Sequence, residues 1–263
     1  MPSHVTAYRR IPVLLLLLIL ALTPAALCES KPAAASHEMI YGYSENGRAL
    51  VCHRIGEENA DSRILLVFGV HGFEDSYDHD GEVLRLIAHR VIDFFSSQTP
   101  ENLALYVVPC ANPDGLLEGT SRNGFGRCNA RGLDINRDFP VNWKEDYHSR
   151  TKTGSAPFST AEARALRDLV EQIAPDFAAD IHGWIDAVYG STPSAEVFAQ
   201  AFGMKRRSIR SGGTLAQWMQ TTLEDAILLE LPANPNEDEY VTRNSEMLIQ
   251  AILNWIALPD TRR

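Results

Sequence analysis

The run Ile64-Leu65-Leu66-Val67-Phe68-Gly69-Val70 is almost entirely apolar and leads directly into His71-Gly72-Phe73-Glu74. An apolar run of this length is typical of a strand that is buried on both faces, as in the parallel part of a helix-covered sheet. His71 and Glu74 would then lie at the edge of a buried sheet, where a polar side chain is costly unless it has a binding partner.

Two other apolar runs end in the same way. Residues 177–181 lead into His182, and residues 226–229 lead into Glu230. Ligand sites in open sheets lie beyond the carboxyl ends of the strands, so we expect these side chains and His71 with Glu74 to converge. Two imidazoles and a carboxylate suit a catalytic zinc, which keeps a fourth position for water, and a further carboxylate could act as base. For either His alone, the alternative to a metal ligand is a histidine with a structural role, hydrogen-bonded at a strand end.

The remaining pattern predicts one α/β domain with a mixed, partly parallel sheet between helices. Asn46-Gly47 signals a tight hairpin between strands over 39–43 and 48–55, and 103–108 is a second buried strand. Apolar positions at helical spacing, or a capping box of Ser159 with Glu162, predict three helices. Their ranges are 81–95, 159–173 and 244–256.

The first 28 residues have the pattern of a secretory signal. Arg9 and Arg10 precede an apolar stretch over 12–22, which is shorter than the ~20 apolar residues that a spanning helix needs. We expect cleavage and a secreted or periplasmic protein; an uncleaved anchor and a lipoprotein at Cys28 are the alternatives. The expected divisions are a signal peptide (1–28), a short extension (29–38) and a single domain (39–260).

Charge and cysteine content bound the function further. Loss of Arg9 and Arg10 takes the net charge from −10 to about −12, which gives no electrostatic reason to bind nucleic acid. Cys110 and Cys128 could form a disulfide worth ~3 kcal/mol in an oxidising compartment, or both could be small buried thiols. Cys52, in a strand-like run, is expected in the core.

Two more motifs lie between Glu74 and His182. The first is Asn112-Pro113-Asp114-Gly115, read here mainly as a turn, and the second is the polar segment 127–139. With these motifs in this order, the chain resembles the M14 family of zinc carboxypeptidases, and its small bacterial murein-peptide branch in particular, from about Tyr41 to Trp255. The resemblance implies a zinc carboxypeptidase-like fold and a zinc-dependent carboxypeptidase or amidase that cuts an amide bond next to a terminal amino acid, in murein peptides.

The resemblance also implies a role for each site residue. A single zinc ion would be held by His71, Glu74 and His182, and Glu230 would move the protons. Arg127 would stabilise charge on the carbonyl oxygen, Asn136 and Arg137 would bind a free carboxylate, and Asp134 would receive a ring proton of His71. A solvated surface charge is the alternative for any one arginine, a turn cap is the alternative for Asp134, and Arg122 is the second choice for the role of Arg127.

The chain departs from the family pattern near Ser211-Gly212-Gly213. Ser208 stands where many members have a Tyr, so a phenol is missing unless Tyr189 or Tyr240 reaches the site. Nearby, Arg206, Arg207 and Arg210 crowd together. They predict either a pocket for an acidic substrate side chain, such as the extra carboxylate of diaminopimelate, or a basic surface turn. Arg210 is taken as a candidate substrate-binding residue.

Other functions remain open at this stage. A general peptide carboxypeptidase would use the same residues, and an aspartoacylase-like N-acyl amino acid deacylase shares the His-x-x-Glu and a later His. The signal segment and the Asp134 to Arg137 motif argue against the deacylase. A zinc-retaining binding protein without turnover would not need Glu230 or Arg127. The expected partner is a peptide or muropeptide, with no nucleic acid and no transmembrane span in the mature form.

Overall fold

The computed structural model describes residues 36–236 and 239–259. The expected signal peptide, with Cys28, and residues 29–35 of the expected extension lie outside the described residues. Among those that are described, no helix is both long enough and apolar enough to cross a membrane.

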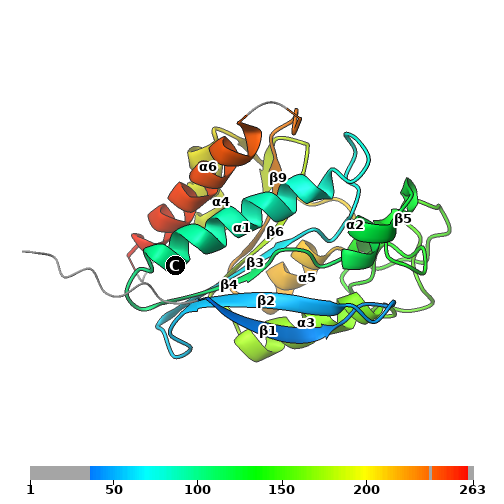
Figure 1. Cartoon of the computed structure of the whole chain (residues 1–263), viewed down its shortest axis with the longest axis horizontal. Helices are drawn as coiled ribbons and strands as arrows, with labels where there is room; N and C mark the ends of the chain where they lie inside the picture. The colour runs from blue at the N-terminus through cyan, green and yellow to red at the C-terminus, as the bar shows by residue number, and fades with distance from the viewer. Residues whose placement is uncertain (1–35, 237–238, 260–263) are drawn as a thin grey trace, which may run out of the picture. The chain divides into compact units, whose positions relative to one another are not determined.

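Strands and helices alternate along the chain, and eight of the nine strands of the described residues form one sheet with helices on both faces (Figure 1). The strands are β1 (His37–Tyr43), β2 (Ala49–Gly56), β3 (Ser62–Phe68), β4 (Leu103–Val108), β5 (Ser121–Cys128), β6 (Phe177–Gly183), β7 (Ala187–Tyr189), β8 (Lys205–Arg207) and β9 (Ala226–Leu231). The helices are α1 (Gly81–Ser97), α2 (Pro113–Glu118), a 3-10 turn (Ile135–Arg137), α3 (Ala161–Ile173), α4 (Pro193–Phe202), α5 (Leu215–Thr222) and α6 (Tyr240–Ile256).

The sheet is mixed, as the sequence predicted. Its order is β1-β2-β4-β3-β6-β9-β7-β8, and the central strands β4, β3, β6 and β9 are parallel to one another. Strands β1, β2 and β7 run antiparallel to their neighbours on the central side of the sheet. The three strands that precede or carry the candidate ligands and Glu230 are therefore adjacent, and their carboxyl ends meet at one edge.

Two helical layers bury the central strands. Helices α1, α4 and α6 cover one face, and α3 and α5 cover the other (Figure 1). On β3, Ile64, Leu66 and Phe68 enter the first layer while Leu65 and Val67 enter the second, because successive side chains of a strand point to opposite faces. Strand burial on both faces explains why these runs are apolar throughout.

Several local expectations need correction. The capping residue of α3 is Thr160, whose side chain accepts a hydrogen bond from the Ala163 amide, and not Ser159. Ser159 instead donates its hydroxyl to Asp138, so it helps to anchor the preceding loop. Helix α6 begins at Tyr240 rather than at residue 244.

The Asn112 motif is also more than a turn. Asn112 caps the short helix α2 by accepting from the Gly115 amide, and its amide group donates to the carbonyls of Arg127 and Cys128 in β5. This places α2 against β5 beside the carboxyl ends of the central strands (Figure 1). Gly72 belongs to the same contact, because a Cβ there would lie 2.4 Å from the backbone of Gly115.

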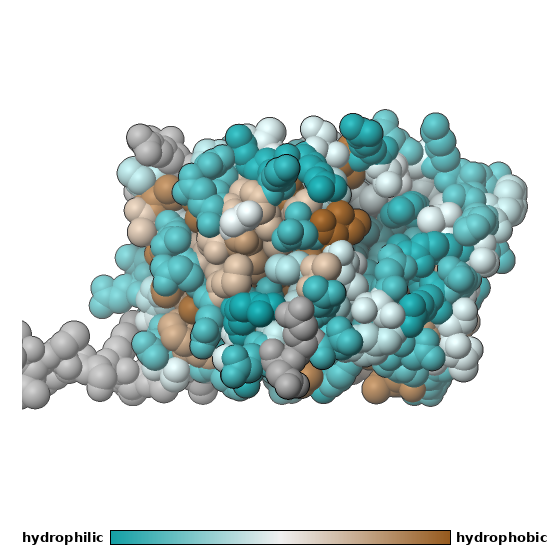
Figure 2. All heavy atoms as spheres, turned by 90° about the horizontal axis from the view of Figure 1, so that it is seen from above, coloured by the Kyte–Doolittle hydropathy of each residue, from teal (hydrophilic) through white to brown (hydrophobic). Residues whose placement is uncertain are grey.

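Figure 2 shows one surface of the molecule, with hydrophilic side chains covering most of the end that carries α2 and β5 in Figure 1. The three cysteines of the described chain are free thiols: Cys52 and Cys128 are buried and Cys110 is partly buried. The structure therefore contains no Cys110–Cys128 disulfide, and Cys52 lies in the core as expected.

Candidate active site

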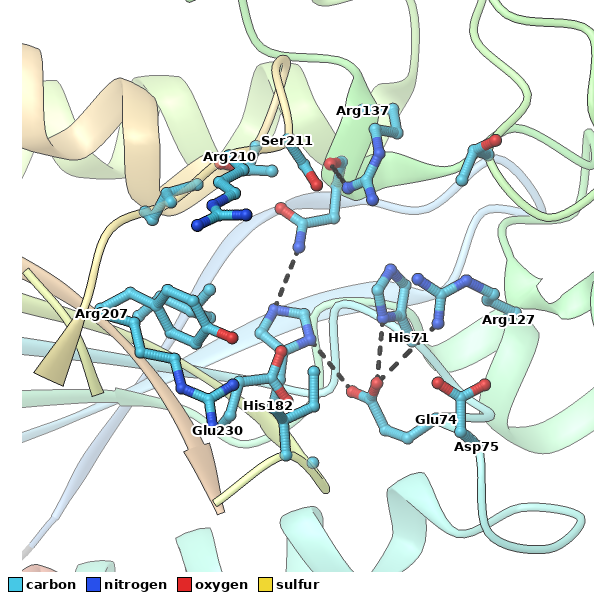
Figure 3. A pocket seen from close by; sticks show the side chains of 18 of the residues that line it. His71, Glu74, Asp75, Arg127, Arg137, His182, Arg207, Arg210, Ser211 and Glu230 are labelled. Atoms are coloured by element: carbon cyan, nitrogen blue, oxygen red, sulfur yellow. Dashed lines mark hydrogen bonds and ion pairs between the residues drawn. The ribbon is translucent and has the colours of Figure 1, made fainter. Parts of the chain in front are cut away.

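Three of the predicted residues converge in a buried cluster at the carboxyl ends of β3 and β6 (Figure 3). His71 and Glu74 lie in the loop after β3, and His182 lies near the end of β6. Glu74 reaches both rings: one carboxylate oxygen is 3.1 Å from Nδ1 of His71, and the other is 3.1 Å from Nδ1 of His182. Each of the three residues offers a ligand atom, and these atoms lie within 4.8 Å of one another.

Two further carboxylates set the tautomers of the rings. Nε2 of His71 lies 3.0 Å from Asp134 Oδ1, and Nε2 of His182 lies 2.8 Å from Asp180 Oδ1. An ionised carboxylate can only accept a hydrogen bond, so each neutral ring carries its proton on Nε2 and keeps a lone pair on Nδ1. Both lone pairs then face the Glu74 carboxylate.

This arrangement fits a divalent metal ion. Without a cation, only an additional proton on each ring could hold Nδ1 against the Glu74 carboxylate; burial opposes that proton, but the Asp180 and Glu74 carboxylates outweigh burial and raise the pKa of His182. The cluster therefore attracts positive charge, and a divalent ion can supply it in place of the protons. His71, Glu74 and His182 are all about 2% exposed, so water cannot substitute freely. Two imidazoles with one carboxylate, each ring held by an outer carboxylate, is the ligand set of a catalytic zinc site.

Glu230 lies beside this cluster without belonging to it. It pairs in register with His182 on the neighbouring parallel strand β9, and its side chain faces the same pocket (Figure 3). Its Oε2 atom is buried and makes no hydrogen bond within the described chain. Burial raises the pKa of Glu230 to about 8, and a cation held by His71, Glu74 and His182 would lower this pKa, so that the ionised carboxylate can accept a proton. A carboxylate that is free of internal partners and open to the pocket is suited to handling a substrate or solvent proton.

Arg127 approaches the cluster from the opposite side, at the end of β5 (Figure 3). Its guanidinium lies 4.0 Å from Glu74 and 3.8 Å from Asp134, and its Nε donates to the Arg150 carbonyl. Burial by itself lowers the pKa of Arg127, but the two carboxylates outweigh burial and raise it. The arginine is thus a fixed, buried cation at the pocket wall. Arg122, the second choice, does not line the pocket.

The 3-10 turn brings Asn136 and Arg137 to the same pocket of about 760 Å³. Asn136 is buried: its Oδ1 accepts from the Leu215 amide, and its Nδ2 lies 3.3 Å from Nε2 of His182. Arg137 is partly exposed and donates to the Asn136 carbonyl. Its remaining donors face the pocket, where they can bind a carboxylate.

A second basic group lines the other end of the pocket. Arg207 and Arg210 are exposed and form no ion pair among the described residues, whereas Arg206 pairs with Glu196 at 3.0 Å, outside the pocket. Tyr189 and Ser208 also line this end. Tyr240 does not, since it is buried and its hydroxyl donates to the Pro232 carbonyl. Of the three arginines that are close together in the sequence, Arg207 and Arg210 therefore line the pocket, and Arg206 forms an ion pair on the surface.

Some site residues were not found from the sequence. Asp180 contacts Nε2 of His182 as Asp134 contacts Nε2 of His71. Asp180 could have been found from the sequence, because it lies two residues before His182 and therefore points to the same face of the strand. Arg150 lines the pocket and pairs with Asp75, but it comes from a polar loop without any recognisable pattern.

Together, the fold and the buried three-ligand centre define an α/β protein with a site suited to one metal ion. Residues 25–197 match the sequence profile of the zinc carboxypeptidase family, Peptidase M14, and this stretch is more than half of the chain. The chain belongs to that family. The match includes the three candidate ligands and ends before Glu230.

Relatives with known names agree with this assignment. The chain is 28% identical over 233 residues to murein peptide amidase A of Escherichia coli K12, covering 82% of this chain and 88% of that protein. It is 33% identical over 231 residues to bacteriocin BCN5 of Clostridium perfringens, covering 84% of this chain but only 26% of the bacteriocin.

Solved structures give the same fold. The murein-tripeptide amidase of Escherichia coli O157 aligns with a TM-score of 0.64 at 26% identity, covering 87% of this chain and 95% of that one. Carboxypeptidase A of Helicoverpa armigera aligns with a TM-score of 0.68 at 18% identity, covering 85% and 68%, and supports the fold alone. The protein is thus a hydrolase like the M14 metallocarboxypeptidases and murein peptide amidases.

Proposed function

We propose that this hydrolase cuts the amide bond next to a terminal amino acid that carries two carboxylates, as diaminopimelate does in murein peptides. The observation that carries the proposal is the pair of basic positions in one pocket. Arg137 lies near the metal ligands, and Arg207 and Arg210, which form no ion pair with any described residue, lie at the other end. One carboxylate would bind Arg137, and the other would bind the distal pair. The similarity to murein peptide amidase A supports the same substrate class.

In the proposed reaction, His71, Glu74 and His182 would hold zinc. When bound, zinc supplies a Lewis acid that polarises the scissile carbonyl and lowers the pKa of water. Glu230 removes a proton from the water that attacks the carbonyl carbon. Arg127 donates hydrogen bonds to the carbonyl oxygen as negative charge develops there. The C–N bond then breaks, and Glu230 passes the proton to the leaving nitrogen, so that an acid and a free amine are released.

The terminal amino acid is oriented by residues of the 3-10 turn. Arg137 can donate two parallel hydrogen bonds to a free carboxylate, which fixes the position of the adjacent amide bond. Requirement for this carboxylate would restrict cleavage to chain ends. A general peptide carboxypeptidase would need Arg137 but would gain nothing from Arg207 and Arg210, and that difference separates the two candidate functions.

We also propose that the protein is exported. The basic and apolar pattern over residues 9–22 supports a signal segment. Expression of the full chain with a C-terminal tag, followed by mass measurement of the protein outside the cytoplasm, tests this. A chain that stays in the cytoplasm with its first 28 residues intact would contradict it.

The substrate proposal is tested with two matched muropeptides, one ending in diaminopimelate and one ending in lysine, which lacks only the second carboxylate. We expect zinc-dependent release of diaminopimelate, and a kcat/KM at least tenfold lower for the lysine peptide. Arg210→Ala should remove this preference by raising KM for the diaminopimelate peptide alone. Equal cleavage of both peptides would favour a general carboxypeptidase.

A further inference from the structure

Asp80 is a fully buried carboxylate that collects donors from two separate parts of the chain. Its Oδ1 accepts from the Glu74 amide at 2.5 Å. Its Oδ2 accepts from the amides of residues 75 and 76 at 3.0 and 2.7 Å, with the Tyr77 amide at 3.4 Å. The indole Nε1 of Trp184 donates to the same oxygen at 2.9 Å.

These contacts have a direct relation to the candidate ligands. Glu74 is itself a ligand residue, and the amides of 74–77 wrap around one carboxylate, which fixes the backbone from which the Glu74 side chain leaves. Trp184 follows His182 by two residues. Asp80 therefore links the loop after β3 to the segment after β6, although these segments are about a hundred residues apart in the chain.

The energetic reason for this arrangement is charge. A buried carboxylate is costly unless several donors compensate it, and hydrogen bonds to a charged group are about twice as strong as neutral ones. Four backbone amides and an indole supply that compensation at Asp80. The same bonds restrict the backbone of the ligand loop, in which residues 75, 76, 78 and 79 are exposed to solvent.

We propose that Asp80 is a positioning residue for the metal centre: it fixes the Glu74 backbone and the segment behind His182 in the geometry that metal binding requires. The proposal rests on the assignment of His71, Glu74 and His182 as zinc ligands. Asp80 touches neither the metal position nor the pocket, so it acts only through these neighbours.

The test is the zinc affinity of Asp80→Asn, measured by competition with a chelator. The amide has a single acceptor oxygen. The orientation that serves the four donors at Oδ2 turns the NH₂ group toward the Glu74 amide and releases this backbone. We expect zinc affinity to fall about 10- to 100-fold, the range seen when residues behind metal ligands are replaced.

Asp114→Asn is the matched control. Asp114 is equally buried and also collects three donors, from Ser44, Asn46 and Arg48, but none of its partners is next to a ligand. Both variants should lower the unfolding temperature of the zinc-free protein, whereas only Asp80→Asn should weaken zinc binding. Equal zinc affinity in the two variants would overturn the proposal.

A milder variant keeps the test decisive if Asp80→Asn does not fold. Trp184→Phe removes one donor to Asp80 and keeps the aromatic contact with Tyr240, whose ring centroid lies 5.7 Å away. We expect a zinc affinity about threefold to tenfold below that of the wild type, in proportion to one lost donor of several; an unchanged affinity would count against Asp80. His71→Ala serves as the reference for a lost ligand, and it should bind zinc weakly. Tight zinc binding by this variant would refute the assignment of the ligands, and with it the positioning role of Asp80.

Discussion

A substitution at Glu230 should affect the chemical step without affecting metal binding. It lies in the pocket beside His182 but outside the three-ligand cluster, so the isosteric change Glu230→Gln removes a proton acceptor and leaves the ligands in place. We expect kcat to fall by roughly 10²- to 10⁴-fold, with little change in KM or bound zinc. Steady-state kinetics and metal analysis on the same preparation measure both.

The control for this variant is Glu224→Gln. Glu224 is exposed and lies just before the start of β9, at the opposite end of the strand that carries Glu230. It should retain full activity. A Glu230→Gln enzyme within tenfold of the wild type would exclude Glu230 as the base, and a zinc-free one would show that the residue supports the metal instead.

The cysteines allow a prediction about pH. Burial raises the pKa of the Cys110 and Cys128 thiols to about 12, above the ordinary value near 8.5. The thiolate is the reactive form, so at pH 8 these residues should be almost entirely protonated and unreactive in the folded protein. Alkylation followed by mass spectrometry should show slow labelling in buffer and rapid labelling in denaturant. A mass that rises by two on reduction would instead reveal a disulfide.

At the residue scale, sequence reasoning found the groups that lie at strand ends and missed those whose role depends on distant donors. His71, His182 and Glu230 each follow or end an apolar run, which is a local signal. The partners of Asp80 come from residues 74–77 and from Trp184, and only the folded chain brings them together. Asp180 lies between the two cases, since its place beside His182 could be derived from strand alternation.

Helix α2 and strand β5 form the element that carries Arg127, and Asn112 joins them. We expect Asn112→Ala to lose the helix cap and both hydrogen bonds to β5, at a cost of ~2 kcal/mol in the free energy of unfolding. Because Arg127 would be less well fixed, kcat should also fall roughly 10- to 100-fold. Denaturant unfolding and kinetics measure the two effects. A variant that loses stability but keeps full kcat would show that β5 positions Arg127 without help from α2.

Elements with a strong periodic pattern were predicted well, and short or polar elements were not. Strands β3, β4, β6 and β9 are buried on both faces and therefore appear as apolar runs. Strand β5, with the sequence Ser-Arg-Asn-Gly-Phe-Gly-Arg-Cys, and β8, with Lys-Arg-Arg, lack that pattern because they lie at the pocket and on the surface. The sequence predicted Ser159 as the cap of α3, whereas the structure has Thr160 in that position. Asp138 accepts hydrogen bonds from the hydroxyls of both residues, and these contacts across 21 and 22 residues cannot be derived from a local pattern.

At the scale of the whole molecule, the metal site joins the loop after β3 to strand β6, two segments that the pairing of β3 with β6 and the hydrogen bonds of Asp80 also connect. Zinc should bind the folded chain and not the unfolded one, since the ligands come from the loop after β3 and from β6. A free zinc concentration 1,000-fold above the dissociation constant should add about 4 kcal/mol to the free energy of unfolding. For a domain of this size, this is a rise of roughly 8 to 16 °C in unfolding temperature. His182→Ala should remove the zinc-dependent rise, and calorimetry with and without a chelator compares the two proteins. If His182→Ala still shows the full rise, zinc binds elsewhere and the assigned centre is wrong.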